Sequence, residues 1–171
     1  MNGSTTTVAR TATAQIVYVA LFGLALGLPL QGADFKFTQV DYPNALATEV
    51  LGIDDQGSFV GAFADNFTAH GFVLRKGKFQ SIDPQGSTLT FARSINDRDE
   101  IVGFYFDANS TQRGFYYYKG QYRTIVVPNS TENDATGIND LGVISGEYVD
   151  LNGIEHGYVL PGGIFRSIDV P

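Results

Sequence analysis

Three aspartates recur at one position of a repeated pattern, where their side chains could bind a ligand. Each ends a Gly-x-aromatic-x-Asp motif, and the three are Asp65, Asp107 and Asp150. Carboxylate oxygens at alternate loop positions are typical Ca²⁺ ligands, and an aromatic ring beside a carboxylate is typical of a sugar-binding edge. Tyr105 and Tyr148 supply that ring, because residues two apart on a strand share a face. These five residues are the candidate ligand-binding set.

The same aspartates also suit a structural role. An Asp that follows a strand can accept hydrogen bonds from the next backbone amides and so close an Asx turn. The motifs lack the bidentate Glu of a complete calcium loop. The sequence therefore favours turn closure, and we expect no cofactor, with Ca²⁺ at these aspartates as the one candidate cation.

Two histidines occupy one repeat position, and the middle copy has an arginine there. His70 and His156 would need further ligands to hold a metal, but the chain contains only these two histidines and no cysteine. Arg113 can donate the same hydrogen bond as a histidine. The pattern favours a local donor over a metal ligand.

Few residues have the setting of a catalytic group. Ser145 replaces the valines found at this position in the other copies, yet it has no Gly-x-Ser-x-Gly context. Paired carboxylates for glycoside hydrolysis would have to come from Asp41, Asp83, Asp169 or Glu147. The aspartates recur as structural residues do, so we do not expect catalysis.

These residues belong to a block of about 43 residues that is written three times and begun a fourth time. An aromatic residue followed three positions later by Ile or Val recurs throughout, and four further landmarks keep the same period. The aromatic landmarks are Phe37, Phe79, Tyr122 and Phe165. A constant period indicates one supersecondary unit whose copies bury their apolar faces against one another.

Within each copy the apolar pattern is that of short strands. The middle copy predicts strands at 78–83, 89–95, 100–106 and 114–118, so each repeat is an antiparallel meander. Lys76-Gly77 and Lys119-Gly120 predict type I′ hairpins, because that turn needs positive φ. The third strands should be the most buried, through Val60, Ile101, Val102 and Ile144.

The first 33 residues lie outside the repeat. They carry one cation, Arg10, and then an apolar run at 16–30, which has the length of a signal-peptide core and is short for a membrane span. We expect a signal peptide at 1–33 and a β-repeat domain at 34–171, with repeats at about 35–77, 78–120, 121–163 and the start of a fourth at 164–171. The expected location is secreted, periplasmic or extracellular.

The composition limits the classes of partner. The net charge is −7, and no cluster of cations marks a nucleic-acid surface. We therefore expect no nucleic acid and, after leader cleavage, no stable membrane span. The absence of cysteine excludes disulfides.

The motif His70-Gly71-Phe72 and its counterparts, Arg113-Gly114-Phe115 and His156-Gly157-Tyr158, resemble an extracellular repeat family named for its His-Ala-Phe motif. The resemblance covers essentially all of the chain after the leader. It implies an exported repeat protein of propeller-like build, and it supplies no catalytic residues. Gly replaces the motif's Ala in every copy, and Val126 replaces an Asp found in the other copies.

The predicted fold is all-β, with three tandem four-stranded repeats arranged as propeller-like blades and a β-trefoil as the alternative. Closed propellers use four to eight blades, so exposed repeat edges could also join copies into an oligomer. We expect an exported, non-catalytic binding module for a glycan, a surface or a protein partner. The alternative is a carboxylate-based hydrolase or an accessory domain of one.

Overall fold

Three four-stranded antiparallel sheets make up the regular structure of residues 35–169, which are the residues that this computed structural model describes. Sheet 1 contains β1 (Ala47–Ile53), β2 (Phe59–Ala64), β3 (Ala69–Arg75) and β4 (Lys78–Ile82). Sheet 2 contains β5 (Leu89–Ile95), β6 (Ile101–Phe106), β7 (Gln112–Tyr118) and β8 (Gln121–Thr124). Sheet 3 contains β9 (Ser130–Ile138), β10 (Ile144–Asp150), β11 (Glu155–Leu160) and β12 (Arg166–Ile168), with a 3₁₀ turn η1 (Pro161–Gly163) before its last strand.

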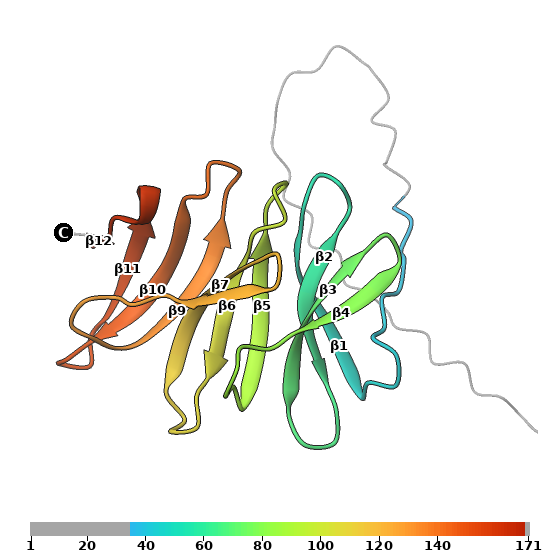
Figure 1. Ribbon diagram of the computed structural model, residues 1–171, viewed down its shortest axis with the longest axis horizontal. Coiled ribbons are helices and arrows are strands. Elements are labelled where there is room, and N and C mark those ends of the chain that lie inside the picture. The colour runs from blue at the N-terminus through green and yellow to red at the C-terminus, as the bar shows by residue number, and fades with distance from the viewer. Residues whose placement is uncertain (1–34, 170–171) are drawn as a thin grey trace, which may run out of the picture. The chain divides into compact units, whose positions relative to one another are not determined.

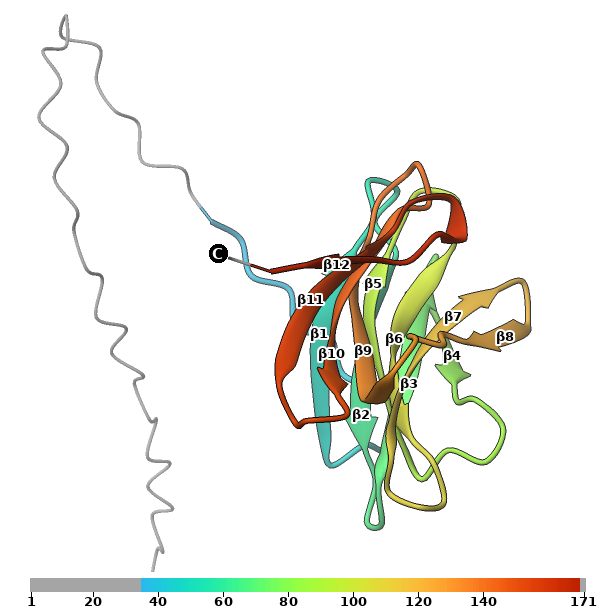
Figure 2. The ribbon, with the colours of Figure 1, turned by 90° about the vertical axis from the view of Figure 1, so that its left-hand side faces the viewer.

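The sheets follow one another face to face within the compact unit that begins at Thr38, with sheet 2 between sheets 1 and 3 (Figure 1). The first strand of each sheet packs against the middle strands of the sheet before it, as β5 does on β2 and β3. Figure 2 shows the hairpin of β7 and β8 projecting from one edge of this unit. The all-β prediction with tandem, blade-like repeats is confirmed. The trefoil alternative is wrong, because within residues 35–169 strand pairing stays inside each four-stranded sheet and closes no barrel.

Each interface between two sheets holds one apolar cluster. The cluster between sheets 1 and 2 includes the fully buried Val60, Ile101 and Phe115, and the cluster between sheets 2 and 3 includes Val102 and Tyr158. The strand that was predicted as the third of each repeat is the second strand of each observed sheet. Its four residues that were expected to be buried, Ile144 included, are all buried. Strands alternate their side chains between two faces, so adjacent residues of β6 serve different interfaces.

The sequence repeat and the sheets share a period but not a boundary. The aromatic-x-x-Ile segment was expected to open each repeat, whereas β4, β8 and β12 each close the preceding sheet as its fourth strand. Within the segment expected to start a fourth repeat, β12 (Arg166–Ile168) thus pairs as the last strand of sheet 3. The hairpins at Lys76-Gly77 and Lys119-Gly120 are confirmed, since both residues of each turn have positive φ, and they join the third and fourth strands of one sheet.

The segment before β1 also differs from the prediction. Residues 37–40 carry the repeated aromatic motif but form no strand. Further on, Tyr42 stacks on Phe63 with ring centroids 3.6 Å apart and meets Phe79 edge-on. Tyr42 thus covers part of the sheet 1 face that has no preceding sheet within the described residues.

The signal peptide expected at 1–33 lies outside the described residues. Among residues 35–169, no helix is long and apolar enough to cross a membrane.

Candidate functional site

The three predicted aspartates close equivalent loops at the ends of β2, β6 and β10. We call residues 65–68, 107–111 and 150–154 the aspartate loops. In each, one carboxylate oxygen accepts two backbone amides: Asp65 Oδ1 accepts from Phe67 and Thr68, at 2.7 and 2.9 Å. Asp107 Oδ1 accepts from the amides of Asn109 and Thr111, and Asp150 Oδ1 from those of Asn152 and Ile154. The Asx-turn interpretation is confirmed in all three copies.

The second oxygen of each aspartate faces a basic side chain of the neighbouring strand. Asp65 Oδ2 lies 3.5 Å from His70 Nε2, and Asp150 Oδ2 lies 3.6 Å from His156 Nε2. In the middle copy Arg113 Nε takes this place, 3.6 Å from Asp107 Oδ2. The expected equivalence of the two histidines and the arginine is therefore confirmed.

Both histidines are held on their other side by a second aspartate. His70 Nδ1 lies 3.2 Å from Asp83 Oδ2, and His156 Nδ1 lies 2.6 Å from Asp169 Oδ1. In sheet 3, Ser167 donates to the same Asp169 carboxylate at 2.9 Å. The serines of these clusters bond to carboxylates and not to imidazole, so the clusters are not nucleophilic triads.

The predicted tyrosines lie within the sheet interfaces. Tyr105 is 9 % exposed and its hydroxyl lies 3.0 Å from Thr124 Oγ1. Tyr148 is half-buried, stacks on His156 with centroids 5.0 Å apart, and its hydroxyl lies 3.1 Å from Ser167 Oγ. Tyr105 has little ring surface left for stacking on a sugar. Direct ligand contact by the aspartates and Tyr148 stays a prediction.

The loop hydrogen bonds shift the pKa values of their acids. Amide donation from Phe67, Thr111 and Ile154 is the largest cause that lowers the pKa values of Asp65, Asp107 and Asp150, respectively. The hydrogen bond that His156 donates to Asp169 is the largest cause of the raised pKa of His156. Because hydrogen bonds to the charged form favour it, these contacts favour the ionised forms of the three aspartates and of His156.

Around these polar closures the loops expose apolar side chains. Phe67 is 93 % exposed, and Leu151 and Ile154 of the third loop are 70 % and 55 % exposed. Exposed apolar groups on loops held by a rigid sheet are a common arrangement for binding. These side chains are not among the residues predicted from the sequence, although each lies within four residues of a repeated aspartate.

The remaining catalytic candidates do not form a site with one another. Asp41 accepts a hydrogen bond from Gln39 at 2.6 Å, and Asp83 and Asp169 bond to the histidines. Ser145 lies exposed on β10, and among residues 35–169 no hydrogen bond links its hydroxyl to a histidine.

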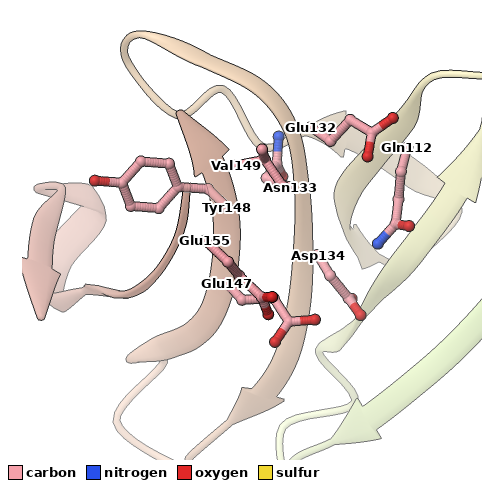
Figure 3. A pocket seen from close by; sticks show the side chains of 8 residues that line it. All are labelled: Gln112, Glu132, Asn133, Asp134, Glu147, Tyr148, Val149 and Glu155. Atoms are coloured by element: carbon pink, nitrogen blue, oxygen red, sulfur yellow. The ribbon is translucent and has the colours of Figure 1, made fainter. Parts of the chain in front are cut away.

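Glu147 does belong to a carboxylate group, which we call the acidic recess. The recess has a volume of about 160 Å³ (Figure 3) and is lined in part by Gln112 of sheet 2 and by Glu132, Asn133, Asp134, Glu147 and Glu155 of sheet 3. Asp134 is buried, whereas Glu147 and Glu155 are exposed. Figure 3 shows the side chains of Asp134, Glu147 and Glu155 reaching toward one part of it.

Burial and mutual repulsion change the pKa values within the acidic recess. Burial is the largest cause that raises the pKa of Asp134 to about 6. Burial and then Glu155 raise the pKa of Glu147. Sequence reasoning considered Glu147 but missed Asp134 and Glu155. A column-by-column comparison of the repeats would have found Asp134, since Phe91 holds its position in sheet 2.

Within the described part of the chain, no group of three or more His, Cys, Asp or Glu side chains is placed to hold a metal ion. No protein-family model matches the chain, and a search of curated proteins finds no similar sequence.

Proposed function

We propose that this chain is an exported, non-catalytic interaction module whose contact surface is formed by the three aspartate loops. One observation carries the proposal: the fold builds the same loop three times, closes each with an Asp, and leaves apolar side chains exposed on two of them. Equivalent loops on one array suit several weak contacts that act together. The partner is a glycan, a surface or another protein.

The repeated polar groups favour this role over catalysis. The aspartates, histidines and arginine are bonded to one another, so they stabilise the loops. The resemblance to the His-Ala-Phe repeat family and the apolar leader support export. In this proposal Asp65, Asp107 and Asp150 act on binding by holding the loops in shape, and Ca²⁺ is not required.

The loop surface is tested with a double variant and a matched control. Phe67→Ser with Leu151→Ser removes the most exposed apolar side chain from each of two loops. Leu141→Ser removes an equally exposed side chain (83 %) from the turn at the opposite end of β10. On a printed glycan panel, wild type and Leu141→Ser should bind alike, while the double variant should lose binding. Equal binding by all three proteins would show that the loops are not the contact surface.

A parallel screen with chromogenic glycoside and ester substrates tests the non-catalytic part. Turnover that disappears in Glu147→Gln would replace the proposal with the carboxylate-based hydrolase. Export is checked separately by the N-terminus of the protein expressed in a secreting host, which should lie near Asp34. An intact Met1 on soluble cytosolic protein would contradict export.

A further inference from the structure

The acidic recess breaks the repeat at one pair of positions. In sheet 2 the cross-strand partners Phe91 and Phe104 stack with ring centroids 5.1 Å apart. The equivalent pair in sheet 3 is Asp134 and Glu147, also directly opposite each other. Like charges opposite each other destabilise a sheet, so sheet 3 carries an unfavourable pair where sheet 2 has a favourable one. Binding sites are a common reason for such an exception.

The negative charge of the acidic recess is only partly balanced. Glu155 adds a third carboxylate beside Glu147. Among the described residues Arg93 is the cation paired with this group: its Nη2 lies 3.4 Å from Asp134 Oδ2, and its Nε is buried without an acceptor. One guanidinium thus faces three carboxylates, and the excess negative charge favours a positively charged ligand.

An independent observation concerns the carboxylate of Asp134, which lines the recess. The Asp134 side chain is 1 % exposed, and its Oδ1 is buried with no hydrogen-bond donor among the described residues. A buried carboxylate oxygen without a donor is costly, and each such atom in a folded protein calls for a missing partner. Asp134 lines the recess, but Oδ1 itself is buried, so a donor that enters the recess reaches this oxygen only when the Asp134 side chain turns toward it.

We infer that the acidic recess binds a lysine or arginine side chain of a partner protein. Ammonium and guanidinium groups carry only donors, and carboxylates carry only acceptors. A divalent ion fits less well, because the described acids do not converge as a metal-binding group. This inference rests on the proposed interaction function and names the chemistry of its partner: a basic segment of a protein.

The test uses the full chain and an acetylated, amidated pentalysine peptide, followed by NMR amide shifts at low salt. Peptide binding should shift the amides of Asp134, Glu147 and Glu155. Glu147→Gln with Glu155→Gln should weaken binding by about tenfold or more. The control, Asp41→Asn with Glu49→Gln, removes two charges elsewhere. Glu49 occupies in sheet 1 the position that Asp134 occupies in sheet 3.

Three results would overturn the inference. Equal weakening by both double variants would mean that the peptide senses only the net charge of −7. Unchanged recess amides would place the peptide elsewhere. CaCl₂ that shifts these amides and excludes the peptide would make the recess a metal site. The recess variant should fold at least as stably as wild type, because it removes carboxylate repulsion. Turnover in the substrate screen would instead contradict the proposed non-catalytic function, whereas the measured binding of the peptide to the recess would remain valid.

Discussion

The backbone amide of Asp97 donates to Oδ1 of Asp140, one repeat further along the chain, at 3.0 Å. The Asp97 carboxylate in turn accepts the amide of Asp55, one repeat earlier, at 2.9 Å. These bonds form a ladder that runs across the turns of all three sheets. They tie the first hairpin of each sheet to the next sheet at positions that the apolar clusters do not reach.

The ladder predicts a split between two substitutions at Asp97. Asp97→Ala removes the acceptor and should cost about 1 kcal/mol of unfolding free energy, the usual net value of such a bond. Asp97→Asn keeps an oxygen acceptor and should cost less than half of that. Urea unfolding of both variants measures the difference, and equal losses would show that charge matters at Asp97 and the hydrogen bond does not.

Gly103 has no room for a side chain. A Cβ at this position would collide with the carbonyl oxygen of Phe91 on the neighbouring strand. Gly103→Ala should therefore destabilise the protein by about 3 kcal/mol or more, or prevent folding. Gly86→Ala is the control, since Gly86 has positive φ but open space, and should cost only about 1 kcal/mol. Similar thermal stability of the two variants would contradict the collision.

His156 should titrate above its ordinary pKa of 6.5, because Asp169 and then Asp150 favour the imidazolium. A raised pKa in the folded state means that this contribution to stability is present below pH 6.5 and is lost as the pH rises through the folded value. The pKa values of Asp169 and Asp150 are lowered from their ordinary value of 3.8. The stabilisation by these carboxylates is therefore present above pH 3.8 and is lost as the pH falls through their folded-state pKa values.

The imidazole proton signals give the His156 pKa directly. Asp169→Asn should bring it down toward 6.5, whereas Asp41→Asn should leave it unchanged. A value that does not respond to Asp169→Asn would mean that the observed contact is not maintained in solution.

Asp134 should make stability depend on pH in the opposite sense to an ordinary ion-paired acid. Its pKa is raised from 3.8 to about 6, so the folded state binds more protons than the unfolded chain between these values. Stability therefore falls as the pH rises through that interval. Asp134→Asn should gain more stability relative to wild type at pH 7.5 than at about pH 4. Urea unfolding at both pH values measures this, and a gain independent of pH would contradict the assigned cause.

Period and apolar alternation were enough to predict the strands and hairpins. They could not locate the sheet boundary, because the aromatic-x-x-Ile strand has the same pattern whether it pairs with the strand before it or the strand after it. The hairpin at Lys76-Gly77 connects equally well in both cases. In the structure β4 pairs with β3 alone, through this hairpin, and no strand of sheet 2 pairs with it.

The candidate site was predicted only in part, because the contacts that complete it also depend on how the sheets pack. The rule that residues two apart share a face placed Tyr105 beside Asp107. However, β6 ends at Phe106, so Asp107 turns into a loop while Tyr105 stays between sheets 1 and 2. Asp134 was not predicted because it stands in the polar run Ser130–Ile138, and its burial depends on contacts with sheet 2 such as that with Arg93.

The ladder of Asp55, Asp97 and Asp140 has a direction, since each amide donates to the carboxylate of the following repeat. The array therefore has a head and a tail. A duplicated unit of about 43 residues, placed between two existing sheets, would receive a donor on one side and an acceptor on the other. Tandem duplication can thus lengthen the array from within, between two sheets that already exist.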